Sequence, residues 1–341
     1  MADSIPARHL EDQMFHTRLC DVLGIDVPVI CAPFGPWEQV DLAAAVCAAG
    51  GLGSLGTAVT PLPALREQWA RLRALTVGPF AINHTARPLD EEAFAATIAF
   101  RPRVISFHLA VCPDLIARAH DADIRWVQQV TDRRQAEEAL AAGTDVVVAM
   151  GSEGGGHGGS VSTLVLVPQV VDLAGEVPVV AAGGIADGRG LAAALALGAS
   201  GVALGTRFLA STEMRVHDDW KRRIVAADAV DAVQVPNTDL FMPPYTRPAP
   251  PARPRALRTS LTDALTDRPG SIDPQAVGAQ LMAALAAGRG DELLPFAGQS
   301  AGLIHDVRPA AQIVRAVLAE AEVALAAAAE QVRRARSVAV R

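Results

Sequence analysis

Residues 145–159 read DVVVAMGSEGGGHGG, a short apolar run followed by a stretch in which six of nine residues are glycine. The apolar run is typical of a buried strand. Ordering glycine in one conformation costs more backbone entropy than ordering any other residue. A cluster of six glycines therefore suggests that the backbone has to approach another group closely. A flexible linker is the alternative, but a helix candidate, TLVLVPQVVDLAG (163–175), follows at once. The pattern therefore predicts a strand that ends at a close backbone contact.

The same alternation of strand and helix runs along most of the chain. Short runs rich in valine and isoleucine predict further strands at 27–34, 52–56, 79–84, 103–109, 125–130, 177–184 and 201–209. Stretches rich in alanine and leucine predict helices between them at 41–50, 62–75, 89–99, 132–143 and 188–198. Apolar strands separated by helices are typical of a parallel sheet buried on both faces. Eight such units predict a (β/α)8 TIM barrel, an α/β fold; a doubly wound open sheet is the alternative.

The alternation stops near residue 214. Residues 214–240 look helical with one polar face, and PPYTRPAPPARPR (243–255) is proline-rich, so we expect it to be extended and connecting. Further helices are predicted near 256–266, 273–288 and 309–336. We therefore predict a barrel formed by residues 14–219 and 298–341, and a smaller, mainly helical cap of residues 220–297 over one end of it.

Composition narrows the class of partner. The chain has 341 residues and a formal net charge of -7, and it lacks a basic stripe, which argues against a nucleic acid or an anionic membrane as partner. The segment MADSIPARHLEDQMFH (1–16) lacks the apolar core of a signal peptide, and no apolar run reaches membrane-spanning length. We expect a cytoplasmic protein that acts on small molecules; a homodimer is left open.

The cysteines do not form a recognisable metal or redox motif. Their spacing contains no CxxC and gives no histidine partner at metal-ligand distance, so we expect no metal site and reduced, mostly packed thiols at Cys20, Cys31, Cys47 and Cys112.

Glycines follow three consecutive strands, in GSEGGGHGG (151–159), AAGGIADGRG (181–190) and ALGTRF (203–208). In a barrel these segments meet at the C-terminal face, where active sites form. Backbone N–H groups can point inward there without obstruction by side chains, which predicts a phosphate cradle; ordinary tight turns are the alternative. The cradle residues are Gly183, Gly184, Gly205 and Thr206.

His157 is the imidazole of the first glycine segment. It lies among residues without competing side chains, and a histidine with an ordinary pKa near 6.5 is available in neutral form to take a proton. We predict that His157 is catalytic, the alternative being a structural histidine. Glu153, four residues upstream, either orients a loop amide or His157, or it caps the loop.

EGGGHGG (153–159), followed by PVVAAGGIADGRGLAAALALGASGVALGTRF (178–208), resembles the nitronate monooxygenases, formerly called 2-nitropropane dioxygenases. Flavin-dependent enoyl-thioester reductases are similar and share the same barrel. The likeness begins near TRLCDVLGIDVPVICAP (17–33) and reappears at AGQSAGLIHDVRPAAQIV (297–314), so it covers most of the chain outside the cap.

The resemblance implies an FMN-binding barrel. It implies that the cradle holds the FMN phosphate, that Asn83 faces the flavin, and that His157 is the base that takes a proton from the carbon next to a nitro group. The full set of implied FMN-contacting residues is Ala32, Pro33, Asn83, Gln129, Met150, Gly155, Gly156, Gly183, Gly184, Gly205 and Thr206.

The activity implied by the resemblance is an FMN-dependent oxidation of a nitronate or nitroalkane by O2 to a carbonyl compound and nitrite. An FMN-dependent NAD(P)H reductase of an enoyl thioester or a quinone is one alternative, and a non-catalytic barrel that binds flavin or phosphate is another. The chain departs from the family at Met150, where glutamine is usual, at Cys31 and Phe34 in the first strand, and at HLAVCP (108–113). Phe34 is expected to narrow the pocket.

Five residues near the expected mouth of the barrel are candidates for contact with a substrate. Packing or exposure to solvent is the alternative for each of His84, His108, His305, Phe241 and Tyr245.

Overall fold

The protein contains a closed barrel of eight parallel strands, as the sequence predicts. The structure is a computed structural model that describes residues 15–249 and 253–339. The strands are hydrogen-bonded in the order β1-β9-β8-β6-β5-β4-β3-β2, and a parallel bridge between Ile30 and Leu52 joins β1 to the start of β2. That bridge closes the ring and excludes the open sheet. The barrel strands are β1 (Val29–Cys31), β2 (Gly53–Gly56), β3 (Phe80–Thr85), β4 (Val104–His108), β5 (Arg125–Val130), β6 (Val146–Met150), β8 (Val179–Ala182) and β9 (Gly201–Leu204).

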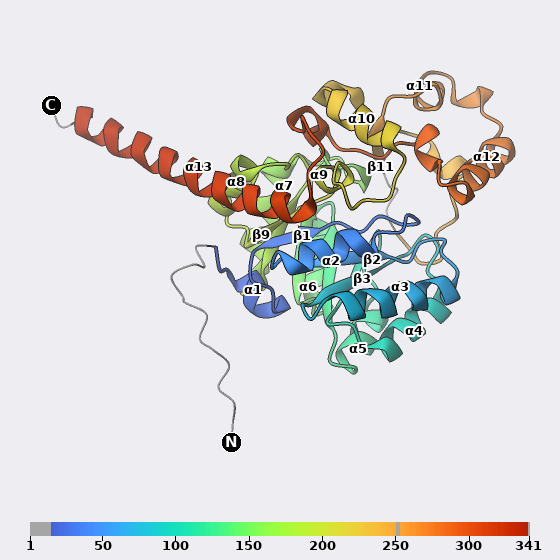
Figure 1. Ribbon diagram of the computed structural model, residues 1–341, viewed down its shortest axis with the longest axis horizontal. Helices are drawn as coiled ribbons and strands as arrows, with labels where there is room; N and C mark the ends of the chain where they lie inside the picture. The colour runs from blue at the N-terminus through green and yellow to red at the C-terminus, as the bar shows by residue number, and fades with distance from the viewer. Residues whose placement is uncertain (1–14, 250–252, 340–341) are drawn as a thin grey trace.

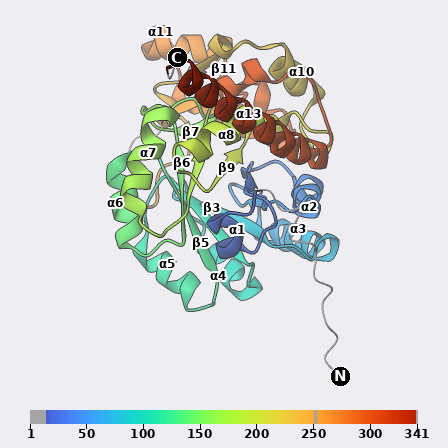
Figure 2. The ribbon, with the colours of Figure 1, turned by 90° about the vertical axis from the view of Figure 1, so that its left-hand side faces the viewer.

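Helices follow the strands and cover the outside of the barrel (Figure 2). Their apolar faces pack on the outward-facing side chains of the strands, while the inward-facing side chains form a second core inside the ring. Leu19 and Leu23 of the first helix join this inner core, so that helix closes the N-terminal end. The helices are α1 (Arg18–Leu23), α2 (Val40–Ala48), α3 (Leu62–Leu75), α4 (Glu91–Phe100), α5 (Pro113–His120), α6 (Arg133–Ala141), α7 (Thr163–Ala174), α8 (Gly188–Ala196) and α9 (Thr206–Leu209).

The last predicted strand is too long. We expected a strand over 201–209, but β9 ends at Leu204 and residues 206–209 form α9. The apolar side chains of Phe208 and Leu209 are buried in the core from a helical turn rather than from an extended segment. An apolar run alone does not distinguish these two conformations.

The described residues between 218 and 303 form helices and two strands (Figure 1). The strands β10 (Ala232–Gln234) and β11 (Arg253–Leu257) form an antiparallel sheet with β7 (Gly156–Gly158), a strand of the glycine segment. The expected helices over 214–240 and 256–266 are therefore wrong in part. The helical elements here are α10 (Asp218–Ala226), α11 (Ser260–Asp267), α12 (Pro274–Ala286), η2 (Ala229–Asp231), η3 (Thr238–Leu240), η4 (Pro269–Ser271), η5 (Gly290–Glu292) and η6 (Gln299–Leu303).

The described part of residues 220–297, for which we keep the name cap, lies at one end of the barrel (Figures 1 and 2). The division of the chain at residues 220 and 297 stays a prediction. Residue 14, residues 250–252 of the proline-rich connection and residues 340–341 lie outside the described residues.

The long helix α13 (Ala310–Ala339) packs along α8 and α2 and then extends beyond the barrel (Figure 1). Gly188 of α8 allows the close approach, because a Cβ atom there would lie 2.2 Å from the backbone nitrogen of Ala321. Among the helices of residues 15–249 and 253–339, none has the length and apolar character needed to cross a membrane.

Candidate active site

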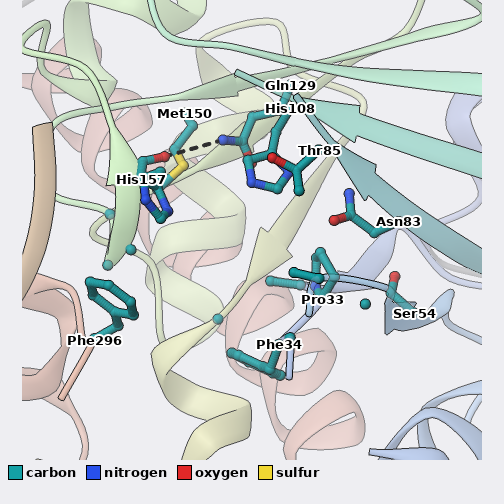
Figure 3. Close-up of a pocket in the computed structure, with 18 of the residues that line it drawn as sticks. Pro33, Phe34, Ser54, Asn83, Thr85, His108, Gln129, Met150, His157 and Phe296 are labelled. Atoms are coloured by element: carbon teal, nitrogen blue, oxygen red, sulfur yellow. Dashed lines mark hydrogen bonds between the residues drawn. The ribbon is translucent and has the colours of Figure 1, made fainter. Parts of the chain in front are cut away.

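A cavity of about 290 Å³ opens at the C-terminal ends of the barrel strands and is bounded on its other side by the cap. It brings together all twelve residues that the sequence predicts for the site, from Ala32 after β1 to Thr206 after β9. Figure 3 shows His157, Met150 and Gln129 on one side of the open space and Pro33 and Phe34 on another. The geometry therefore agrees with the predicted set, whose individual roles stay predictions.

Glycine is required at the end of β8. Gly183 and Gly184 have φ angles of +97° and +73°, in the left-handed region that other residues rarely adopt. A Cβ atom on Gly183 would also lie 2.9 Å from the carbonyl oxygen of Gly151. Within the described part of the chain, the backbone N–H groups of Gly184, Gly205 and Thr206 make no hydrogen bond. These three residues line the cavity and offer free donors to an anion.

The glycine segment lies against the chain that leads from the cap into η6. A Cβ atom on Gly155 would lie 2.6 Å from the carbonyl carbon of Ala297 and from the nitrogen of Gly298, so no larger residue fits. The N–H of Gly298 donates to the hydroxyl oxygen of Thr206 at 2.8 Å. One wall of the cavity is thus built from three distant parts of the sequence.

His157 is held by the sheet that joins the glycine segment to the cap. It lies in β7 opposite Pro254 of β11, and its carbonyl oxygen accepts a long hydrogen bond, 3.5 Å, from the side-chain amide of Gln129 (Figure 3). The imidazole lies between the rings of Phe296, at 5.7 Å between centroids, and His108, at 6.4 Å. Its Nε2 atom is buried and has no hydrogen-bond partner in the described residues. The neighbouring rings therefore hold the imidazole in place, and its Nε2 atom makes no hydrogen bond to the described residues.

The surroundings of His157 favour its neutral form. The loss of water around the enclosed imidazole lowers the pKa of His157 to about 3, and repulsion from His108 and Arg87 acts in the same direction. Burial likewise lowers the pKa of His108 to about 4. Both rings are therefore neutral at pH 7, and either can accept a proton only at the expense of a charge placed in an enclosed site.

Glu153 fastens the glycine segment and does not contact His157. Its carboxylate accepts hydrogen bonds from the backbone N–H of Thr163, at 3.0 Å, and from the hydroxyl of the same residue, also at 3.0 Å. Thr163 is the first residue of α7, and its hydroxyl in addition contacts the carbonyl oxygen of Gly183 at 2.9 Å. These contacts fit two of the roles left open by the sequence, orientation of a loop amide and a loop cap, and they do not orient His157.

Several polar residues that sequence reasoning missed line the cavity on β2, on β4, and at and just after the end of β3. The amide nitrogen of Asn83 donates to the hydroxyl of Ser106 at 3.0 Å, so Ser106 orients a predicted flavin contact. Thr85 and Arg87 lie just after the predicted strand 79–84, so the signal used for Asn83 could have found them. Ser54 and Ser106 lie within the predicted strands 52–56 and 103–109, where the sequence does not show which side chains face the cavity. The missed polar residues are Ser54, Thr85, Arg87 and Ser106.

Arg87 is the only Lys, Arg, Asp or Glu among the residues described as lining the cavity. Its guanidinium donates to Asp239 at 2.5 Å, to the carbonyl oxygen of Pro243 at 2.7 Å and to the hydroxyl of Tyr245 at 3.2 Å. These contacts link the end of β3 to the cap. The carboxylate of Asp239 neutralises much of the positive charge of Arg87.

Of the five candidates at the mouth, only His108 lines the cavity. His84 is buried and hydrogen-bonded through Nδ1 to Thr57 and through Nε2 to Thr97, so it is a packing residue. Tyr245 contacts Arg87, Phe241 packs inside the cap, and His305 is exposed away from the cavity.

The cysteines are all buried, free and outside the cavity lining. Burial raises the pKa of the Cys112 thiol to about 11, which makes it a poor nucleophile. Among the described residues, no group of His, Cys, Asp and Glu side chains could hold a metal ion.

The family model and a curated relative that match this chain carry the same family description. A family model described as nitronate monooxygenase matches residues 16–99 and 84–320. A nitronate monooxygenase of Paraburkholderia phytofirmans is 34% identical over 273 residues, which cover 64% of this chain and 73% of that protein. The solved structure of FabK from Thermotoga maritima superposes with a TM-score of 0.80 at 32% identity and covers 95% of this chain and 99% of that one.

A second curated relative has another activity in its name. The (3aS,4S,5R,7aS)-5-hydroxy-7a-methyl-1-oxo-octahydro-1H-indene-4-carboxyl-CoA dehydrogenase of Mycobacterium tuberculosis is 41% identical over 214 residues. The match covers 62% of this chain and 60% of that relative, so the chain spans less than two thirds of the relative's length.

Proposed function

The chain belongs to the nitronate monooxygenase family, and we propose that it is an FMN-dependent monooxygenase that oxidises a nitronate or nitroalkane with O2 to a carbonyl compound and nitrite. The observation that carries the proposal is the neutral imidazole of His157, fixed in the wall of a glycine-rich cavity with an unpartnered Nε2. A base in this position suits a carbon acid, whose proton has to be removed before oxidation.

The residues present fit FMN. The unpaired N–H groups of Gly184, Gly205 and Thr206 suit a phosphate, because several backbone donors without side-chain obstruction form an anion site. Asn83 has a side-chain oxygen for which no donor is present among the described residues, which suits a ring N–H. When bound, FMN supplies the transfer of electrons to dioxygen, and the protein supplies orientation, charge and the base.

Each protein group then has a role in handling the substrate. His157 accepts the proton from the carbon next to the nitro group. The hydroxyl groups of Thr85 and Ser106, which line the cavity, stabilise the negative charge that develops on the nitro oxygens. Phe296 packs beside the imidazole and limits the access of water.

A second candidate function is the transfer of hydride between NAD(P)H and a thioester or quinone. The similarity to FabK over nearly the whole chain and to a CoA dehydrogenase at 41% identity favours it. A barrel that binds flavin or phosphate without chemistry is the remaining alternative, and the fixed imidazole argues against it.

Anaerobic titration of the yellow protein distinguishes these functions. We expect the flavin absorbance to bleach with ethyl nitronate and to stay unchanged over minutes with NADPH. Rapid bleaching with NADPH and none with the nitronate would establish the reductase instead, and no bleaching with either reagent would favour the non-catalytic barrel.

A further inference from the structure

The side of the cavity that the cap provides is apolar throughout. Nine cap residues line it, and none carries a charged side chain or a carboxamide: Trp220, Met242, Pro243, Leu281, Met282, Leu285, Gly290, Leu294 and Phe296. The barrel side, in contrast, contributes serine, threonine, asparagine and glutamine side chains. The cavity is therefore polar at the expected reaction centre and apolar where it extends under the cap.

Helix α12 provides the most exposed part of this surface. Leu281 and Leu285 lie one turn apart on the same face of the helix, and both line the cavity. Neither belongs to any of the apolar core clusters of the described residues. Met282, beside them, also lines the cavity and is 47% exposed. Leu281 is buried and Met282 is exposed, and all three side chains line the cavity.

Three residues outside α12 complete the surface: Trp37, Trp220 and Leu294. A Cβ atom on Gly290 would lie 2.3 Å from Cδ2 of Leu285 and 3.4 Å from Cζ2 of Trp37, so these two side chains converge over a residue that has no side chain. The rings of Trp37 and Trp220 pack at 5.0 Å between centroids and form a rigid neighbouring wall.

We propose that this surface, the apolar arm (Trp37, Trp220, Leu281, Met282, Leu285 and Leu294), binds a bulky hydrocarbon group of the substrate. The substrate is then a carbon acid with a large apolar substituent, not a short nitroalkane; the identity of its reacting end rests on the proposed function. Burial of hydrocarbon strengthens binding roughly fourfold for each methylene group removed from water. The arm thus adds affinity that the polar end of the cavity does not provide.

Charge argues against a second anionic group in this part of the substrate. Arg87 is the one Lys or Arg side chain among the described cavity residues, and its guanidinium already binds Asp239 and the carbonyl oxygen of Pro243. An anionic tail placed under the cap would lose its hydration without gaining a partner.

The first test compares chain lengths. The nitronates of nitroethane and 1-nitrohexane have the same reacting end and differ by four methylene groups. We expect kcat/KM to be on the order of 10²-fold higher for the longer nitronate, from the fourfold gain per methylene. Equal values for the two nitronates would overturn the arm.

Variants on helix α12 test whether the apolar arm causes the preference for the longer nitronate. Leu285→Glu places a charge in the arm and Leu285→Trp fills it, and both should bring the ratio of the two kcat/KM values close to 1. Ala283→Glu, an exposed position on the same helix, adds the same charge outside the cavity and should retain the wild-type ratio. Far-UV circular dichroism checks that each variant is folded. If both Leu285 variants fold and keep the full ratio, the arm does not bind the chain.

A binding measurement separates this inference from the proposed function. Because Trp37 and Trp220 belong to the arm, 1-decanol, which does not react, should give a saturable change in tryptophan fluorescence that Leu285→Glu abolishes and Ala283→Glu keeps. Saturable binding of 1-decanol without oxidation of either nitronate would leave the arm standing and refute the monooxygenase. Oxidation of both nitronates at equal kcat/KM without a saturable signal would refute the arm alone.

Discussion

His157 and Pro254 face each other across the antiparallel ladder between β7 and β11. On the opposite edge of β11, the carbonyl oxygen of Pro254 accepts a hydrogen bond from the N–H of Val235. One edge of β11 therefore pairs with the cap, and its other edge pairs with the glycine segment. The cap thereby fixes the segment that carries the imidazole, and the predicted base owes its position to residues nearly 100 positions away.

The role of His157 as a base predicts a difference between two forms of one substrate. His157→Ala should fold and keep its flavin, and kcat/KM on neutral nitroethane should fall by roughly 10²–10⁴-fold, the usual contribution of a positioned base. Ethyl nitronate has already lost its proton, so its oxidation should fall much less. Steady-state assays with both forms check this, and an equal loss for the two would assign His157 a role other than proton removal.

The depressed pKa of His157 predicts an unusual pH profile. A base must be unprotonated to act, and with a pKa of about 3 the imidazole of the free enzyme stays neutral well below pH 6.5. On neutral nitroethane, kcat/KM should therefore be flat from pH 8 down to about pH 5, the range in which an ordinary histidine would lose activity. A fall with an apparent pKa near 6.5 would contradict the enclosed environment of the ring.

His84 should contribute to the loss of stability in acid. Burial lowers its pKa to about 3 in the folded protein, while the unfolded chain has the ordinary value of 6.5. Between these values the unfolded state binds more protons, so the free energy of unfolding decreases as the pH falls below 6.5, by up to about 1.4 kcal/mol per pH unit for this residue. Urea unfolding at pH 7 and pH 5 should show a smaller difference for His84→Gln than for the wild type.

The phosphate cradle depends on Gly183. Gly183→Asp would place a carboxylate at the cradle, in a backbone conformation that aspartate adopts with strain, and the purified variant should lack flavin. Gly143→Asp is a matched control, because Gly143 also has a positive φ angle of +86° but has open space around it. The ratio of visible to ultraviolet absorbance measures flavin content, and a fully yellow Gly183→Asp protein would refute the cradle.

Glu153 is predicted to act on the site through the loop. Glu153→Ala removes the hydrogen bonds to Thr163 and leaves a backbone N–H at the start of α7 without its partner, which should cost about 1–3 kcal/mol of unfolding free energy. Urea denaturation measures that loss. The kcat on nitroethane should fall as well, while the pH profile keeps its shape, because Glu153 does not contact the imidazole.

The sequence predicts the barrel and its glycines because these depend on local patterns. Most of the barrel strands lie in short apolar runs, and Gly183 and Gly184 are required by the backbone conformation at the end of one strand. The cap was predicted less well because its strands depend on distant pairing. Residues 253–257 include a proline and two arginines, and they form β11 only because β7 and β10 lie on either side.

The same reason explains which cavity residues were missed. Arg87 could be found at the end of a strand, but Leu281 and Leu285 lie on a helix whose sequence gives no sign that it faces a cavity. Their position follows from the path of the chain between residues 257 and 297, which no local pattern encodes.

The central claim is that glycine backbone at the C-terminal end of the barrel holds FMN within reach of His157. The most direct test is the visible absorption spectrum of the purified protein, followed by identification of the released cofactor by mass spectrometry. We predict a flavin spectrum and one FMN per chain. A colourless protein that FMN does not reconstitute, or one that contains only FAD, would contradict the account.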